Sequence, residues 1–206
     1  MSKNLVITIG REFGSKGHEI ARHLSEIMGI KMYDKELIRI VAESHGYSEE
    51  VLHDIDETAT NSFLYALSTG AHTHHTAMFA GIHMPMTDKA FIACSQLIKE
   101  IAEEESCIIV GRCADSVLKD HENLFTVFIH ADMEDRIDRI CEYEKISRKE
   151  AEALIKKEDK KRANYHNYYA DTKWGSAKTY DLCINSAIGI EKAAELIKYA
   201  AEQNLA

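Results

Sequence analysis

Short runs rich in apolar and β-branched residues alternate with longer segments of helical periodicity along this chain. The short runs occupy residues 5–9, 31–33, 107–111, 125–131 and 180–185. Because they are largely apolar rather than alternating in polarity, they are typical of strands buried on both faces of a parallel sheet. Between them, apolar residues recur at helical spacing, as in Ile20, Leu24, Ile27 and Met28. The pattern therefore predicts an α/β fold.

A long, highly charged helix is expected over residues 148–170. Ser147 and Glu150 stand three residues apart at its start, so each side chain can bond the other's backbone amide. Asp132 predicts a similar capped start for the preceding helix. The apolar stripe of the long helix, which includes Leu154, is too thin for full burial. Such a helix is expected to project from the body of the protein or to cover a cleft.

The stretch from about 48 to 106 contains no convincing strand and is expected to form a helical insertion with a mobile loop. The chain has one proline and no low-complexity tract, so no linker divides it into independent parts. One core normally serves a chain of 206 residues. We therefore expect residues 1–206 to form a single domain.

Composition and charge narrow the classes of function. A formal net charge of -9 argues against nonspecific binding to nucleic acid or to an anionic membrane, because both depend on excess Lys and Arg. The apolar stretch near residue 5 is too short for a signal peptide, so none is expected, and no apolar run is long enough to span a membrane. Its five cysteines are scattered and odd in number, which favours reduced thiols in a cytoplasmic protein. The oligomeric state cannot be read from the sequence.

The loop after the first apolar run holds the clearest chemical motif. Against the phosphate-binding pattern GxxxxGK[ST], it reads Gly10, four residues, and then Ser15, Lys16 and Gly17. It follows a predicted buried strand and leads into an amphipathic helix, which is the setting that phosphate binding requires. Backbone amides of residues 14–18 and the positive end of the helix would hold phosphate oxygens, and the Lys16 ammonium would reach between them. The alternative is an ordinary glycine turn.

Five stretches, in this order over nearly the whole chain, resemble the cytidylate kinase-like family of P-loop nucleoside monophosphate kinases: GREFGSKGHEIA, YDKELI, VGRCAD, KKRANYHNYY and YDLCIN. The resemblance implies a three-layer α/β/α P-loop NTPase fold with a five-stranded parallel sheet. It also implies a helical acceptor-binding insertion, at about 48–106, and a lid that closes over the phosphates, at about 145–175. Ser15 and His18 depart from the family's loop, which has the form GxxxxGKGT.

The implied activity is transfer of a phosphoryl group from ATP, with Mg²⁺, to a nucleoside monophosphate such as CMP or dCMP. Two alternatives stay open. One is a nucleotide-binding sensor or interaction protein of kinase descent that lacks transfer activity. The other is a kinase for a non-nucleotide small molecule.

The resemblance also assigns roles to residues. The ATP-binding set is Gly10, Arg11, Gly14, Ser15, Lys16, Gly17 and His18. The acceptor-binding set is Asp34, Arg112 and Asp115, although Asp34 could also begin a helix. Cations suited to the charge of the transition state are Lys16, Arg162 and Lys161. The alternative for the basic cluster around Arg162 is a solvated charged face.

Other features allow more than one interpretation. Arg136 and Arg139 could be lid arginines or partners of nearby acids, and Asp181 and Asn185 could contact the donor adenine. The ligands of Mg²⁺ stay open among Ser15, Glu12 and Asp115. An aromatic cluster could pack a lid hinge or stack on a base; its members are Tyr165, Tyr168, Tyr169 and Trp174. Four histidines are expected to bind metal adventitiously or not at all; they are His72, His74, His75 and His83.

Overall fold

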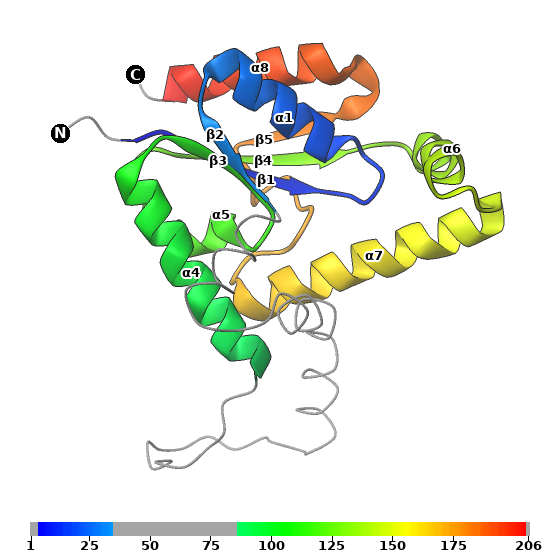
Figure 1. The fold of residues 1–206 in the computed structure, drawn as a ribbon, viewed down its shortest axis with the longest axis horizontal. Coiled ribbons are helices and arrows are strands. Elements are labelled where there is room, and N and C mark those ends of the chain that lie inside the picture. The colour runs from blue at the N-terminus through cyan, green and yellow to red at the C-terminus, as the bar shows by residue number, and fades with distance from the viewer. Residues whose placement is uncertain (1–3, 35–85, 205–206) are drawn as a thin grey trace.

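The computed structural model describes residues 4–34 and 86–204. Its centre is a five-stranded sheet with the strand order β2-β3-β1-β4-β5 (Figure 1). The strands are β1 (Val6–Arg11), β2 (Lys31–Tyr33), β3 (Cys107–Val110), β4 (Leu124–His130) and β5 (Leu182–Asn185). Every neighbouring pair is parallel. The α/β fold with a five-stranded parallel sheet is therefore confirmed.

Helices cover both faces of the sheet. In Figure 1, α1 (Gly17–Met28) and α8 (Ile190–Asn204) lie on one face. On the other lie α4 (Met86–Glu104), the short α5 (Ala114–Val117) and α7 (Arg148–Tyr169). The helix α6 (Met133–Glu144) follows β4, and the 3-10 helix η1 (Ser186–Ile188) follows β5. This is the three-layer α/β/α arrangement expected from the resemblance.

Each face of the sheet has its own apolar core. Ile7 and Ile9 of β1 pack with Ile20 and Leu24 of α1, and all four side chains are fully buried. On the opposite face, a second cluster contains Ile98 of α4 together with residues of β3. Burial on both faces explains why the strand sequences are apolar rather than alternating.

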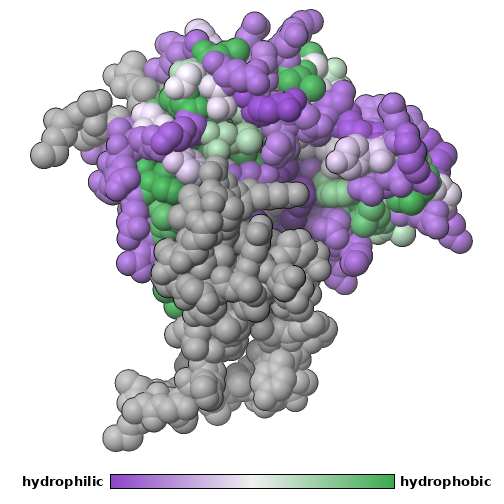
Figure 2. Space-filling view, viewed as in Figure 1, coloured by the Kyte–Doolittle hydropathy of each residue, from purple (hydrophilic) through white to green (hydrophobic). Residues whose placement is uncertain are grey.

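The α6–α7 pair is held by a small core and by capping. The Ser147 hydroxyl accepts from the Glu150 amide while the Glu150 side chain accepts from the Ser147 amide, so the predicted capping box is confirmed. Asp132 does occupy the N-cap of α6, but its side chain makes no capping hydrogen bond, which corrects that expectation. Ile155 is fully buried against α6 while most of α7 stays polar. Figure 2 shows hydrophilic residues dominating this part of the surface, with only small hydrophobic patches.

Part of the predicted insertion lies outside the described residues. Only α4 belongs to the described structure, and it matches the helix expected at the end of that stretch. The four histidines of residues 72–83 lie outside it as well. No helix among the described residues is long and apolar enough to cross a membrane. All five cysteines are free thiols.

Candidate functional site

The loop between β1 and α1 has a backbone register that differs from the motif match. β1 continues through Gly10 to Arg11, and α1 begins at Gly17. Lys16, directly before the helix, has a left-handed backbone with φ 61°, a conformation that favours glycine. In the P-loop pattern the second glycine immediately precedes the lysine. By conformation, Lys16 therefore stands at the position of that glycine, and Gly17 stands at the position of the lysine.

Three arginines hold the carbonyl groups of this loop. An Nη of Arg162 donates to the Arg11 carbonyl at 3.0 Å. Arg136 Nε donates to the Phe13 carbonyl at 2.8 Å, and Arg139 donates to the Gly14 carbonyl. These arginines lie on α6 and α7, which are distant from the loop in sequence. The loop is therefore fixed from outside by two helices, one of which lies in the predicted lid.

One loop amide already holds an anion. The Phe13 N–H donates to the Asp159 carboxylate at 2.7 Å, and Arg136 pairs with the same carboxylate. Arg136 is also 3.0 Å from the Glu12 carboxylate, and its side chain is only 3% exposed. The amides of Gly17 and His18 lie in the first turn of α1, where no helical carbonyl can reach them. The Asp159 carboxylate therefore occupies the Phe13 amide and ties α7 to the loop, whereas the amides at the start of α1 have no helical acceptor.

The loop offers few ligands for Mg²⁺. The Ser15 hydroxyl donates to the Glu12 carbonyl at 2.9 Å, and Ser15 is 1% exposed, so its oxygen is unsuited to binding a metal. The Glu12 carboxylate accepts from the Ala131 amide at 3.1 Å in addition to pairing with Arg136. Two of the three candidates from the sequence are thus engaged in the fold. A Mg²⁺ ion at this loop would depend mainly on phosphate oxygens and water.

A cavity of about 230 Å³ lies between the carboxyl ends of β1 and β3 and the helix α7. Its lining brings together Gly10, Arg11 and Asp34 with Arg112, Asp115 and Arg162. The carboxyl edge of an open parallel sheet is where ligands of α/β proteins bind. Residues that the resemblance assigns to ATP, to the acceptor and to the lid therefore meet at one cavity.

The Arg11 side chain packs closely against two glycines and points toward Asp34. A Cβ at Gly17 would lie only 2.6 Å from Arg11 Cβ, and a Cβ at Gly111 would overlap the Arg11 guanidinium, so a larger residue at either position would displace Arg11. The guanidinium reaches the Asp34 carboxylate at 3.4 Å, and His18 Nε2 reaches the other oxygen of Asp34 at the same distance. Arg11 and His18, expected in the ATP set, are thus placed beside Asp34 of the acceptor set.

The lid cations differ in their placement. Lys157 and Lys160 are exposed, whereas Lys161 and Arg162 are partly buried and line the cavity. The Arg162 guanidinium lies 5.4 Å from the centre of the Phe13 ring. Burial lowers the pKa of Arg162, and the charges of Asp159, Glu158 and Asp34 act in the opposite direction. Of the four cations in this basic cluster, Lys157 and Lys160 therefore form a solvated face, and Lys161 and Arg162 do not.

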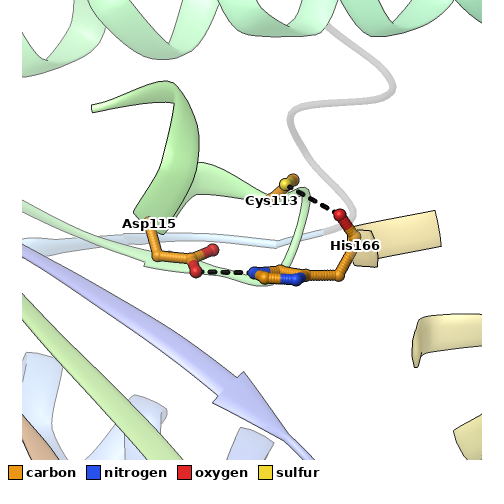
Figure 3. Close-up of side chains that lie close together, drawn as sticks. All are labelled: Cys113, Asp115 and His166. Atoms are coloured by element: carbon orange, nitrogen blue, oxygen red, sulfur yellow. Dashed lines mark hydrogen bonds and ion pairs between the residues drawn. The ribbon is translucent and has the colours of Figure 1, made fainter. Parts of the chain in front are cut away.

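Asp115 and His166 form a hydrogen-bonded pair at the cavity (Figure 3). His166 Nε2 lies 2.7 Å from Asp115 Oδ2, and the two side chains are 5% and 13% exposed. Cys113, two residues before Asp115, donates its thiol to the His166 carbonyl at 4.0 Å. His166 was not singled out from the sequence, because a lone histidine on a polar helix carries no signal.

The same three side chains could be considered as a metal site. One atom each of Cys113, Asp115 and His166 lie within 4.8 Å of one another. Burial, and secondarily the charge of Asp115, raise the pKa of the Cys113 thiol to about 12. A metal would therefore have to deprotonate this thiol and separate the Asp115–His166 pair. A soft thiolate and an imidazole are also unsuited to Mg²⁺, so the cluster fits a hydrogen-bonded unit better than a metal centre.

The aromatic cluster packs against the body of the protein. Tyr169 stacks on Phe91 of α4 with ring centres 3.8 Å apart, and its hydroxyl donates to Asp88. Trp174 meets Phe128 of β4 edge to face, with ring centres 5.1 Å apart. These contacts favour the packing interpretation over stacking on a base.

The two residues at β5 are used inside the fold. Asp181 accepts from the Thr126 amide and hydroxyl at 2.8 Å, which links the start of β5 to β4. Asn185 accepts from the Ala187 amide at 2.9 Å and so caps η1. Both side chains thus have partners within the fold, and a contact with the donor adenine stays a prediction.

Comparison with known proteins agrees with this geometry. A solved structure of an uncharacterized protein from Eubacterium ventriosum ATCC 27560 is 31% identical, with a TM-score of 0.70, covering 97% of this chain and 99% of that one. Shikimate kinase from Bacteroides thetaiotaomicron is 12% identical, with a TM-score of 0.55, covering 96% of this chain and 98% of that one. The APS kinase CysC of Mycobacterium tuberculosis is 15% identical, with a TM-score of 0.50, covering 97% and 98%. The two kinases show the P-loop kinase fold alone.

No curated protein sequence matches this chain significantly. The model of the cytidylate kinase-like family matches residues 6–188, which span the sheet, the loop, the cavity and α7. That range includes every residue that the cavity brings together. This chain belongs to the cytidylate kinase-like family.

Proposed function

We propose that this protein transfers the γ-phosphoryl group of MgATP to a small-molecule acceptor bound in the cavity between the sheet and α7. The observation that carries the proposal is the meeting of Arg11 from the loop, Asp34 and Arg112 from the acceptor set, and Lys161 and Arg162 from α7 at one cavity. P-loop kinases in general use ATP and Mg²⁺. The acceptor that the sequence favours is a nucleoside monophosphate, in particular a pyrimidine such as CMP or dCMP.

Each group of residues has its own role in this proposal. The amides of residues 14–18 and the positive end of the α1 dipole bind the phosphate oxygens of ATP. Arg162 and Lys161 face the cavity from α7 and stabilise the charge spread over the transferred group. Lys16 adds a third positive charge from the loop. Asp34, Arg112 and Asp115 hold the acceptor at the opposite wall.

The region of about residues 145–175, which contains α7, acts as the lid in this proposal. Arg162 connects it to the Arg11 carbonyl, while Arg136 and Arg139 of the neighbouring α6 bond the next loop carbonyls. A lid that rests on the phosphate loop excludes water from the transferred group, which prevents hydrolysis of ATP in place of transfer. The helical insertion at about 48–106, of which α4 belongs to the described structure, would contribute to binding of the acceptor.

A coupled assay of ADP release tests the proposal. The wild-type protein is mixed with MgATP and a panel of nucleoside monophosphates, with a mixture lacking acceptor as the reference. We expect ADP formation that depends on one pyrimidine monophosphate and that is lost in Arg162→Ala. If the protein binds ATP but no nucleoside monophosphate raises ADP release, the nucleoside monophosphate assignment fails. A kinase for a non-nucleotide acceptor, or a nucleotide sensor or interaction protein, is then left.

One observation favours a second acceptor class. The cavity contains a carboxylate, Asp115, that is oriented by a histidine rather than paired with a cation. A nucleoside monophosphate presents an anion to its kinase, whereas an alcohol presents a proton. A non-nucleotide acceptor with a hydroxyl group is therefore the second candidate.

A further inference from the structure

We infer that the acceptor attacks through a hydroxyl group that Asp115 deprotonates, with His166 as the positioning residue, so that the substrate class is a small alcohol. This inference rests on the proposed phosphoryl transfer from ATP. It selects the non-nucleotide class, such as a polyol, sugar or hydroxy acid, over a nucleoside monophosphate.

The first support is the state of the histidine. His166 Nε2 bonds Asp115 Oδ2 at 2.7 Å, and His166 Nδ1 is buried with no hydrogen-bond partner among the described residues. A doubly protonated ring would bury an N–H group at Nδ1 with no acceptor, which is costly. This geometry favours the tautomer that carries its proton on Nε2, directed at Asp115 Oδ2. The imidazole then orients the carboxylate, which lines the cavity that would hold the acceptor.

The second support is the backbone that presents Asp115. Three consecutive residues at the end of β3 are left-handed, namely Gly111, Arg112 and Cys113, with φ of 77°, 59° and 57°. Two of them are not glycine, so this conformation is strained, and such strain persists where the surroundings hold it in place. The turn places Asp115 in the first turn of α5, at the wall of the cavity. A buried turn of this kind fixes the direction of one carboxylate.

The third support is the chemistry that surrounds the pair. Cys113 and Tyr180 also line the cavity near Asp115. Burial is the main cause that raises the pKa of each, with the Asp115 charge adding to it, so both stay protonated at neutral pH. Cys113 and Tyr180 are therefore unsuited to act as the base. Two other carboxylates line the same cavity, Asp34 and Glu158, and Asp34 is paired with Arg11 and His18. Asp115 is the carboxylate of this lining that a hydrogen bond to His166 orients. His166 is a poorer candidate for the base, because its Nε2 bonds Asp115 and its Nδ1 is buried.

The proposed transfer accounts for every proton and every bond without a further reactant. The O–H bond of the alcohol breaks, and its proton passes to an oxygen of Asp115. The alcohol oxygen forms a bond to the γ-phosphorus while the bond from that phosphorus to the bridging oxygen breaks, which releases ADP. Asp115 then returns the proton to water when the products leave. The phosphate of a nucleoside monophosphate is already deprotonated and needs no such base.

The products distinguish the two classes of acceptor. Wild-type protein is incubated with γ-labelled MgATP and two pools, one of sugars, polyols and hydroxy acids, and one of nucleoside monophosphates. We expect label in a phosphate ester, which survives brief hot acid. Label only in an acid-labile anhydride formed from a monophosphate overturns this inference and leaves phosphoryl transfer from ATP in place. Transfer to neither pool by protein that binds ATP overturns both proposals.

Variants of the pair provide the second test. Asp115→Asn is expected to lower kcat with the alcohol by about 10²- to 10⁴-fold, the usual contribution of a general base. The KM for ATP should not change, and Asp120→Asn, an exposed acid just after α5, is the matched control. His166→Gln keeps a side-chain donor and should retain more kcat than His166→Leu, with thermal unfolding followed for each. Wild-type kcat in a folded Asp115→Asn protein, or equal loss in the two His166 variants, overturns the assigned roles.

Discussion

Replacing Lys16 by glycine tests the register of the phosphate loop. Lys16 has φ 61°, and a left-handed conformation costs a non-glycine residue about 1–2 kcal/mol. Glycine removes that cost but gives the unfolded chain more freedom, which offsets about 0.5–1 kcal/mol. We expect Lys16→Gly to stabilise the fold by roughly 0.5–1 kcal/mol. For a chain of this length, that corresponds to a rise in Tm of about 1–4 °C.

Thermal unfolding of the wild type, Lys16→Gly and Lys16→Ala measures this effect. Alanine removes the same charge and side chain but keeps a Cβ, so it retains the strain and serves as the control. The order of stability should be glycine variant first, with alanine and wild type within about 0.5 kcal/mol of each other. A glycine variant that is no more stable than the alanine variant would refute the assignment of Lys16 to the glycine position.

Three further predictions follow from the same site. Lys16 stands at the glycine position, whereas Arg162 faces the cavity, so Arg162→Ala should lower kcat more than Lys16→Ala does. A larger loss of ADP release in Lys16→Ala than in Arg162→Ala would contradict this prediction. Asp159→Asn should lower stability by about 1–3 kcal/mol, because Arg136 loses a charged partner. In titrations this variant should also bind ATP more tightly, since a negative charge beside the phosphate loop is removed. Weaker ATP binding would show that Asp159 helps to hold the nucleotide. Hydrogen bonds from the Ser147 hydroxyl and then from its amide lower the pKa of Glu150. The capping box therefore stabilises the fold above the ordinary glutamate pKa, and this stabilisation is lost as the pH falls through the lower pKa of the folded state. In Glu150→Gln, the free energy of unfolding should fall less steeply toward acid pH than in the wild type, and an equally steep fall would count against this reasoning.

The fold could be predicted because its signals are local. The strand around Ile7 is continuously apolar because both faces of the sheet are covered, and that pattern is visible in the sequence alone. The capping box at Ser147 follows from two residues three positions apart. The resemblance added the order of the motifs and the five-stranded sheet.

The site was predicted less completely because its contacts join distant segments. The pair of Asp115 and His166 is separated by 51 positions, and no periodicity connects them. Arg136 was given two roles from its sequence neighbours, yet its partners are Glu12 and Asp159. Lys16 was matched to a motif by spacing, whereas its role in the loop is set by a backbone angle that no residue pattern records.

The central claim is phosphoryl transfer from ATP at the cavity beneath α7. The most direct measurement follows the γ-phosphoryl group of labelled MgATP into an acceptor, with wild type and Arg162→Ala compared under the same conditions. The account predicts label in a small-molecule phosphate with the wild type and little or none with the variant. ATP binding by both proteins, with label found only in ATP and inorganic phosphate, would contradict it.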